Sequence, residues 1–432
     1  MKPSTTTIAN EHAVIIGGSI AGLLAAAVLC KHFKKVTLLD GDELKHGIDA
    51  RKATPQANHV HGLLNSGWEA VKELFPGVEP ELMALGAHNV HFGNEFRWHH
   101  FGKVKAQFDE PMYGPFMSRS CLELTLYNRI KTFKNLEVLQ QCKVRKVIGS
   151  KSKIDGVLTE NGDEILADLV LDASGRGSNT AASLVDLGMQ PVEKKVLAAG
   201  LRYTSARFTP HKDFNPSWKA LFVSPKPPIS QAAAIFPISK GEWIVTVSGR
   251  QKDVMPTTHE EFLKYTEQLQ TSEVREALEG ATAQSELRHF RYKESRRFYY
   301  ENAQMPKNLV VMGDALCSFN PIFGQGMTVC AMEALALDKL LSAGDFNSND
   351  FYKEAVSVVN VAWKMITVED MRHTHLHDKI PFKVKMMQWF SAKVYDKASI
   401  CPELNKKFYE VIHFTRPASD LRKLSVLWKV LR

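Results

Sequence analysis

Cysteine is scarce in this chain, with 6 among 432 residues, and no two of them form a Cys-x-x-Cys pair. A chain of this length can bury its core without disulfides, so we expect reduced, mostly buried thiols and a cytoplasmic location. Long apolar runs are also missing, since no stretch reaches the roughly 18 continuous apolar residues of a membrane-spanning helix. The sequence thus predicts neither a disulfide-stabilised fold nor a transmembrane segment.

Concentrated basic motifs are absent as well. The chain carries 55 Lys and Arg against 47 Asp and Glu, but no zinc finger, RNA-binding motif or long Lys/Arg run accompanies this excess. We therefore expect no nucleic-acid partner and interpret the net charge of +8 as a positive field for anionic cofactors. A P-loop and a Ser/His/Asp hydrolase elbow are missing too.

The apolar run 13–29, which ends before Cys30, superficially looks like a lipoprotein signal. The segment before it has Lys2 as its single basic residue and includes Glu11, so the positive region of a signal is missing. Glycines also interrupt the run. We interpret it instead as part of a βαβ unit, with a strand at 13–16, a turn at 17–22, a helix at 20–31 and a strand at 36–39.

The turn 17–22 reads Gly-Gly-Ser-Ile-Ala-Gly and approximates the Gly-x-Gly-x-x-Gly fingerprint of dinucleotide-binding folds. Serine replaces the middle glycine but is small enough for the backbone to approach a pyrophosphate at the helix N-terminus. Asp40 ends the second strand, at the distance where a carboxylate meets a ribose hydroxyl. The alternative is an ordinary βα turn. The expected cofactor contacts are Gly17, Ser19, Ile20, Ala21, Gly22 and Asp40.

Two later segments, 167–171 and 308–312, also read as strands that run into turns, and 325–341 is apolar at helical spacing. Segments 196–207, 232–237 and 243–248 alternate in polarity, which predicts an antiparallel sheet, while 210–228 reads as a connecting loop. The chain from Asp350 onward reads as helical. We therefore predict an α/β fold with three parts: a discontinuous Rossmann-type cofactor domain (1–90, 115–190 and 300–345), an inserted antiparallel-sheet substrate domain (91–114 and 191–299) and a helical C-terminal region (346–432).

These motifs together resemble the FAD-dependent monooxygenases of the para-hydroxybenzoate hydroxylase type, whose relatives include squalene-type epoxidases and flavin-dependent halogenases. The resemblance spans roughly residues 13–345. It is carried by 17–22 with Asp40, by 51–56, by Arg119, by the Asp-Ala-Ser-Gly-Arg-Gly-Ser segment 172–178, and above all by Gly-Asp-Ala at 313–315 with Pro-x-x-Gly-Gln-Gly at 321–326.

The resemblance implies FAD as cofactor and assigns roles to individual residues. Asp314 is expected to hydrogen-bond the ribityl chain, and the turn 321–326 to open a helix whose N-terminus faces the flavin pyrimidine edge. Arg119 is expected near the phosphates and ribose, unless it pairs at the surface, and Arg51 near the ribityl region. The implied contacts are Arg51, Arg119, Gly313, Asp314, Pro321, Gly324, Gln325, Gly326 and Met327.

The electron donor is less clearly indicated. Ser174 stands where NADPH-using hydroxylases of this type usually carry aspartate, so either NAD(P)H or reduced flavin from a partner reductase could supply electrons. The halogenase motif Trp-x-Trp-x-Ile-Pro and the halogenase lysine motif are absent, which disfavours halogenation itself.

The resemblance implies oxygen insertion into an electron-rich aromatic or alkene substrate, by hydroxylation or epoxidation through a flavin C4a-hydroperoxide. The expected substrate is an apolar or aromatic small molecule, in a pocket that Trp98, Phe222, Phe236 and Phe319 are candidates to line. Two alternatives stay open: an FAD-dependent reductase of the geranylgeranyl-reductase type, and a halogenase-related flavoprotein that acts on a protein or carrier-bound substrate.

Some residues have no assigned role. His59 and His61 are candidates for a proton relay or a hydrogen bond to FAD, or else a packed pair. Glu369, His373 and His377 could share a helix face as metal ligands, but a solvated face is the simpler interpretation, and we predict no metal site. Residues 421–431 read as a basic amphipathic helix that either docks on the core or contacts a membrane surface or partner.

Overall fold

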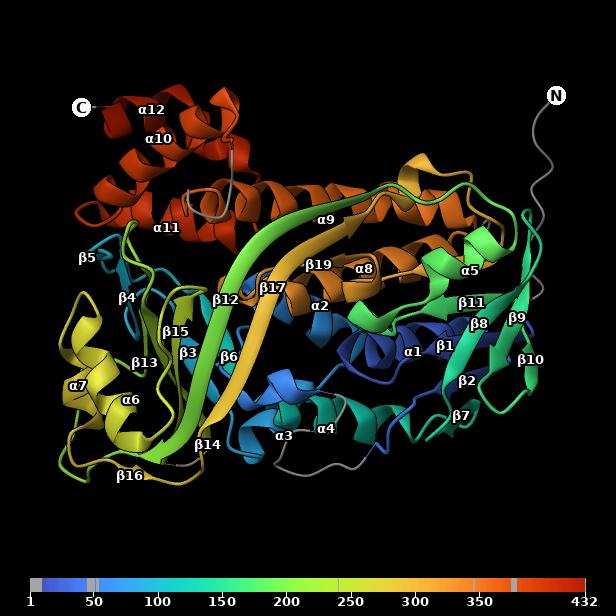
Figure 1. Ribbon diagram of the computed structural model, residues 1–432, viewed down its shortest axis with the longest axis horizontal. Coiled ribbons are helices and arrows are strands. Elements are labelled where there is room, and N and C mark those ends of the chain that lie inside the picture. Colours follow the sequence, from blue (N-terminus) through green and yellow to red (C-terminus); the bar gives the residue numbers. More distant parts are fainter. Residues whose placement is uncertain are drawn as a thin grey trace.

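The computed structural model describes residues 10–44, 51, 54–239, 241–344, 346–373 and 379–431. A parallel sheet with its helices forms one end of the molecule, and a larger antiparallel sheet forms the other (Figure 1). The C-terminal helices lie at the corner beside the larger sheet (Figure 1).

The parallel sheet has five strands in the order β18-β11-β1-β2-β7. Four of its strands are short, apolar and almost entirely buried, as expected for a parallel sheet that is covered on both faces, whereas the edge strand β7 is partly exposed. They are β1 (His12–Ile16), β2 (Lys35–Leu39), β7 (Leu136–Leu139), β11 (Leu169–Asp172) and β18 (Leu309–Val311).

Helix α1 (Ile20–His32) packs against α4 (Arg119–Ile130) and α8 (Gly326–Ser342), and α8 packs in turn against α2 (Asn65–Leu74). Because α1 is enclosed on nearly all sides, it carries alanine, leucine and valine all round rather than one apolar stripe. A three-stranded meander packs on β11; its strands are β8 (Val144–Gly149), β9 (Ile154–Thr159) and β10 (Glu164–Leu166).

The larger sheet has nine strands in the order β19-β17-β12-β15-β14-β13-β4-β5, with β16 on β12. Its pairs are antiparallel except β13 with β4. The strands are β4 (Phe96–His100), β5 (Lys103–Val104), β12 (Lys194–Thr209), β13 (Ala220–Val223), β14 (Ala232–Ser239), β15 (Glu242–Arg250), β16 (Thr282–Ala283), β17 (Arg288–Phe298) and β19 (Cys317–Ser318).

Shorter elements complete the fold. A hairpin pairs β3 (His88–His91) with β6 (Tyr113–Phe116), and the small helices are α3 (Val78–Ala84), α5 (Thr180–Asp186), α6 (His259–Tyr265) and α7 (Glu273–Leu278). Helix α9 (Ser348–Asp370) contacts both sheets, through β18 and β12, and leads to α10 (Phe382–Lys397), α11 (Pro402–Ile412) and α12 (Leu424–Leu431).

The α/β fold predicted from the sequence is confirmed, and each predicted strand and helix lies within a few residues of an observed one. The predicted loop 210–228 is partly wrong, because it contains β13. This strand is only four residues long and flanked by prolines, so its own sequence carries little strand signal, and its pairing with β4 and β14 fixes it.

All six cysteines are free thiols. None of the helices in the described part of the chain is long and apolar enough to cross a bilayer.

The turn after β1 is possible only with glycine at two points. Gly17 has a φ of +100°, which is strained for any residue with a side chain. A Cβ at Gly22 would lie 1.7 Å from the carbonyl oxygen of Gly17, far inside van der Waals contact. Helix α1 can therefore start directly under the turn only because position 22 has no side chain.

We predict that Gly22→Ala lowers the free energy of unfolding by about 2 kcal/mol or more, because the turn must move away from α1. Chemical denaturation measures this change. Gly177→Ala is the matched control, since a Cβ there meets no atom within 4 Å. Equal stability of the two variants would contradict the close approach at Gly22.

Candidate cofactor and active site

Turns that are far apart in the sequence meet at one edge of the parallel sheet. Strands β18, β11 and β1 are parallel neighbours, so their carboxyl ends lie side by side. A Cβ added at Gly17, after β1, would lie 2.6 Å from the carbonyl oxygen of Ala173, after β11. A Cβ at Gly313, after β18, would lie 3.0 Å from Cβ of Ala21. The three predicted motifs therefore touch one another.

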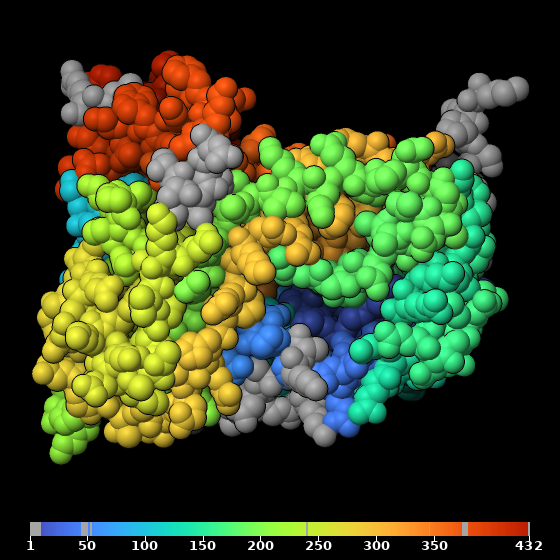
Figure 2. All heavy atoms as spheres, viewed as in Figure 1, coloured from blue at the N-terminus to red at the C-terminus, as the bar shows by residue number. Residues whose placement is uncertain are grey.

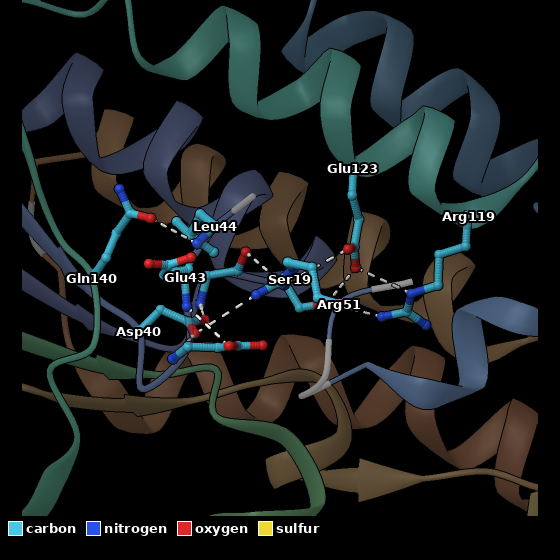
Figure 3. A network of polar contacts seen from close by, with 10 residues as sticks. Ser19, Asp40, Glu43, Leu44, Arg51, Arg119, Glu123 and Gln140 are labelled. Carbon is cyan, nitrogen blue, oxygen red and sulfur yellow. Dashed lines mark hydrogen bonds and ion pairs between the residues drawn. The ribbon is translucent and has the colours of Figure 1, made fainter. Parts of the chain in front are cut away.

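Asp40 follows β2 and faces the first turn. Its Oδ2 accepts the N–H of Gly18 at 2.6 Å, and its Oδ1 accepts the N–H of Asp42 at 2.8 Å. The guanidinium of Arg51 lies beside this carboxylate, with Nη1 3.6 Å from Oδ1 (Figure 3). Its Nη2 donates to the carbonyl oxygen of Gly18 at 3.4 Å. Arg51 thus lies against the glycine-rich turn, at the end next to Asp40.

Glu123, on α4, faces the same turn (Figure 3). Its Oε1 accepts hydrogen bonds from Oγ of Ser19 at 2.5 Å and from Nε of Arg119 at 3.1 Å, while Nη2 of Arg119 donates to Ser19 at 2.9 Å. Its Oε2 lies 3.6 Å from Arg51. The sequence interpretation did not include Glu123, although its spacing of four residues from Arg119 on one helix indicates such a pair.

These residues fit a dinucleotide pyrophosphate. The N–H groups of the first turn of α1 have no partners within the helix, and Gly17 and Gly18 have no side chains to shield them. Arg51 and Arg119 place two guanidinium groups over them, and the buried Nη1 of Arg51 has no hydrogen-bond partner among the described residues. An anion that lies on the turn would accept hydrogen bonds both from the free N–H groups of α1 and from Nη1 of Arg51.

Asp314 lies in the turn after β18. A Cβ at Gly175 would lie 3.9 Å from Cβ of Asp314, and a Cβ at Gly326 would lie 3.9 Å from its Oδ1. The side chain is exposed to solvent, yet burial by the surrounding protein raises the pKa of Asp314, against the opposing effect of Arg119 and Arg176. The carboxylate is therefore at the bottom of an opening in the molecule rather than on its outer surface.

Figure 2 shows this face hollowed, with N-terminal residues in dark blue at the floor. Arg176 connects its turn to the larger sheet, since its Nη1 donates to the carbonyl oxygen of Glu294 at 3.0 Å and to Oγ of Ser318 at 2.5 Å. Its guanidinium also lies 4.7 Å from the ring centroid of Tyr292. Arg176 belongs to the motif that carried the family resemblance, and its turn lies next to that of Asp314 because the preceding strands β11 and β18 are paired.

Glu333 fixes the Gly313–Asp314 turn from below. This α8 residue is fully buried, and its Oε2 accepts the N–H of Gly313 at 2.7 Å. Burial raises the pKa of Glu333 to about 8, and the negative charge of Asp314 adds to the effect. The carboxyl is thus mostly protonated at neutral pH.

The turn that precedes α8 is fixed by a buried ion pair. Asn320 accepts the N–H of Ile322 through Oδ1 at 3.1 Å and donates through Nδ2 to Oδ1 of Asp370 at 2.7 Å. The same oxygen accepts from Arg250 at 3.1 Å. Burial raises the pKa of Asp370 to about 6, against the effect of Arg250. The ion pair thereby connects β15 and α9 to the turn of Pro321 and Gly324.

The turn 321–326 and the first turn of α8 lie next to Asp314. Gly324 has a φ of +65°, which reverses the chain before α8 begins at Gly326. Met327 is in the first turn of α8, where N–H groups have no partners within the helix. Gln325 is buried, and its Oε1 has no hydrogen-bond partner among the described residues. The arrangement leaves a helix N-terminus next to the carboxylate of Asp314.

The two candidate histidines lie in different surroundings. Nδ1 of His59 is 2.7 Å from Oγ of Ser205 inside the larger sheet, and burial lowers the pKa of His59 to about 4. His61 donates from Nδ1 to the carbonyl oxygen of His59 at 2.9 Å, and burial, with Arg119, lowers its pKa to about 3. Both imidazoles are neutral at pH 7. His61 keeps an unprotonated Nε2 as an acceptor.

His61 also lines a small, partly open pocket next to the cofactor region, together with Leu63, Pro115, Met117, Ser118, Arg119, Leu122 and Met327. The larger sheet contributes a second apolar surface near the turn, where Ile322 packs against Leu201, Tyr203, Phe290 and Tyr292.

The aromatic residues predicted to line the substrate pocket are packed in apolar clusters, and their role in substrate binding stays a prediction. Trp98, Phe222 and Phe236 belong to a cluster with the C-terminal helices, where Trp98 stacks 5.7 Å from Phe408. Phe319 is buried in the core of the parallel-sheet end.

The predicted helix face of Glu369, His373 and His377 is only partly described. Glu369 is bound to Arg372 and to the hydroxyl of Tyr395, and His373 is buried. His377 lies outside the described residues. Within the described ranges, no three His, Cys, Asp or Glu side chains are grouped closely enough to hold a metal ion.

We predict that Glu333→Gln flattens the pH dependence of stability. The folded pKa of about 8 exceeds the unfolded value, so the native state binds the extra proton between pH 4.5 and 8, and stability falls as pH rises through this window. A neutral glutamine removes that fall. Unfolding free energies at several pH values measure it, with Glu354→Gln as an exposed control on α9. Parallel pH profiles of the parent and Glu333→Gln would contradict the raised pKa.

Comparisons with known proteins agree with this geometry. Residues 11–344 match the family model described as FAD binding domain. Protein Rv3254 of Mycobacterium tuberculosis is 28% identical over 391 residues, which cover 85% of this chain and 81% of that protein.

The fold is similar to several solved structures of low sequence identity. PqsL, a probable FAD-dependent monooxygenase from Pseudomonas aeruginosa, is 18% identical with a TM-score of 0.64, over 85% of this chain and 100% of that one. The flavin-dependent brominase Bmp2 is 14% identical with a TM-score of 0.67, over 93% of each chain. A flavoprotein/dehydrogenase from Cytophaga hutchinsonii is 17% identical with a TM-score of 0.68, over 98% of this chain and 97% of that one.

The family match covers most of the chain and includes all three motifs that meet at the sheet edge. The chain therefore belongs to the FAD binding domain family and is a flavin-dependent oxidoreductase.

Proposed function

We propose that this protein is an FAD-dependent monooxygenase that inserts one oxygen atom from dioxygen into an apolar aromatic or alkene substrate. The observation that carries the proposal is the sheet edge at Asp314, which combines a dinucleotide-binding turn, a solvent-exposed carboxylate and the N-terminus of α8. The fold similarity to PqsL supports it.

The residues at the sheet edge would hold FAD along its length. The turn 17–22 and the N-terminus of α1 take the pyrophosphate, with Arg51 and Arg119 as counter-charges. Asp40 would hold the adenosine ribose, and Asp314 would accept hydrogen bonds from the ribityl hydroxyls. The first N–H groups of α8 stabilise negative charge at the pyrimidine edge.

Bound FAD supplies the chemistry of dioxygen activation, and the protein positions the substrate and excludes water. In the overall reaction one oxygen atom enters the substrate and the other leaves as water, which consumes two electrons from a donor and two protons. His61, with its low pKa, suits a hydrogen-bond acceptor toward substrate or cofactor better than a proton carrier.

The proposed substrate class rests on the apolar side chains near His61 and near the turn of Ile322. Leu63, Met117 and Met327 line the pocket beside His61, and Phe290 and Tyr292 lie across the turn of Ile322. These surfaces favour an apolar, planar body over a highly charged one. Reduced thiols and the soluble cofactor are consistent with a cytoplasmic enzyme.

The electron donor is either NAD(P)H or reduced flavin from a partner reductase. Ser174 stands where NADPH-using hydroxylases usually carry aspartate. Its hydroxyl donates to Oδ1 of Asp172 at 2.5 Å, and its N–H donates to the same oxygen at 2.9 Å. Both hydrogen bonds of Ser174 therefore stabilise the turn that follows β11. Aerobic turnover with NADPH, NADH or a separate flavin reductase distinguishes these donors.

A second candidate function is FAD-dependent reduction, which the fold similarity to the Cytophaga hutchinsonii flavoprotein/dehydrogenase favours. The same cofactor site would serve it. The two reactions differ in the fate of dioxygen, which gives a direct experiment.

We predict that purified protein, loaded with FAD and supplied with a reductant, incorporates labelled oxygen from ¹⁸O₂ into members of a panel of apolar aromatic and alkene compounds. Mass spectrometry of the products measures incorporation, and H₂¹⁸O with unlabelled dioxygen is the control. A reduced product that carries no label would support the reductase function instead.

We predict that Asp314→Ala weakens FAD binding by about tenfold or more, because the hydrogen bonds of a charged acceptor to the ribityl chain are lost. Flavin absorbance per protein and titration of the apoprotein measure the change. Asp186→Ala, which removes an exposed carboxylate at the end of α5, is the control. Flavin content equal to that of the parent would contradict the assigned role of Asp314.

A further inference from the structure

Exposed apolar side chains are concentrated on the C-terminal helices. Of the fifteen large apolar side chains that are exposed in the described part of the chain, seven lie between residues 382 and 428. Phe382, Met386 and Trp389 on α10, with Leu424 and Trp428 on α12, are between 56% and 85% exposed. We call these five residues the apolar patch.

The patch lies on adjoining helices with a regular spacing. Phe382, Met386 and Trp389 recur every three or four residues, which places them on one face of α10. Leu424 and Trp428 are four residues apart and share a face of α12. The two helices contact each other and lie together at the C-terminal corner of the molecule (Figure 1).

These side chains are additional to the ones that hold the helices in place. Val394 and Tyr395 of α10, and Val426 and Val430 of α12, are buried against Phe408 and the aromatic cluster of β4. Both helices therefore pack through an apolar inner face and also carry exposed apolar side chains on an outer face. Monomeric proteins rarely expose contiguous apolar surface of this kind without an interaction partner.

The exposed tryptophans are also confined to the C-terminal helices. The chain has seven tryptophans, and five of them are less than 10% exposed: Trp68, Trp98, Trp218, Trp243 and Trp363. The two exposed tryptophans, Trp389 and Trp428, both belong to the apolar patch. Tryptophan is favoured where a surface meets the headgroup layer of a bilayer, because its ring is apolar and its N–H is polar.

The net positive charge of the molecule is also concentrated in the C-terminal helices. Residues 379–431 contain eleven Lys and Arg against four Asp and Glu, a net charge of +7 out of +8 for the whole chain. Lys383 and Lys385 alternate with the patch residues on α10, are exposed, and form no ion pair within the described residues. The rest of the protein is close to neutral, so this corner carries the positive field.

We propose that the apolar patch and its lysines dock the protein on the surface of a bilayer that contains anionic lipids. The lysines attract the headgroups, and the apolar side chains enter the interface between headgroups and acyl chains. A second copy of the chain is disfavoured as the occupant, because it would place two surfaces of net charge +7 against each other. An acidic protein partner explains the lysines but not the two exposed tryptophans and Phe382 together.

The experiment measures binding of the full FAD-loaded protein to vesicles. Vesicles of phosphatidylcholine with phosphatidylglycerol are compared with vesicles of phosphatidylcholine alone, by flotation and by tryptophan fluorescence. The expected result is binding to the anionic vesicles that weakens at high salt, with a blue shift of emission and quenching by brominated lipid.

Two double variants separate the contributions. Lys383→Glu with Lys385→Glu, and Trp389→Ala with Trp428→Ala, are each expected to weaken binding by about tenfold or more. Lys146→Glu with Lys151→Glu is the charge control, and Leu166→Ser is the apolar control, since these exposed residues lie in the meander at the other end of the molecule (Figure 1). Unchanged thermal unfolding and FAD content confirm that the variants fold.

Several outcomes would overturn the proposal. These are absence of binding to anionic vesicles, equal binding to neutral vesicles, or binding that the control variants weaken as much as the patch variants do. A stable dimer in light scattering, lost in the tryptophan variant and without vesicle binding, would assign the patch to self-association. Lysine-dependent binding of an acidic protein without vesicle binding would assign it to a protein partner.

Discussion

The site depends on the adjacency of three parallel strands. Because β1, β11 and β18 are neighbours in one sheet and run in the same direction, their following turns must share one edge. The contact is close enough that side chains are excluded at Gly17 and Gly313, where added Cβ atoms would meet Ala173 and Ala21. The glycines of the motifs are therefore requirements of packing between turns as well as of access for a ligand.

Electrostatics at this edge follow from limited access to solvent. Asp314 faces the hollow with Arg119 and Arg176 nearby, whereas Glu333 is enclosed beneath it and is mostly protonated at neutral pH. Two ionised carboxylates so close together would repel each other in a poorly solvated region. Protonation of the buried partner leaves the negative charge on the carboxylate that faces the cofactor region.

The larger sheet and the C-terminal helices complete the molecule in different ways. Helix α9 joins the two ends, and its last residue, Asp370, links Arg250 of the sheet to Asn320 of the turn before α8. A shift of the sheet would thus be transmitted to the flavin-facing turn through a buried ion pair. Beyond α9, the helices use one apolar face to cover the sheet and leave another exposed, which separates a structural role from an interaction role.

The sequence by itself determined the parallel-sheet end and the positions of its motifs, because glycine spacing, apolar periodicity and Asp-ended strands are local signals. Gly22 and Asp40 were identified from such signals, and Asp314 was identified from the resemblance to a known family. Only the tertiary structure decided that Glu123 lies between Arg51 and Arg119, that Glu333 supports Gly313, and that Trp98, Phe222 and Phe236 share one cluster with the C-terminal helices. These relations join residues that are tens to hundreds of positions apart, and burial and ion pairing between distant segments leave no periodic trace in the chain. Residue type indicates what a side chain can do, but its neighbours across the fold determine what it contacts.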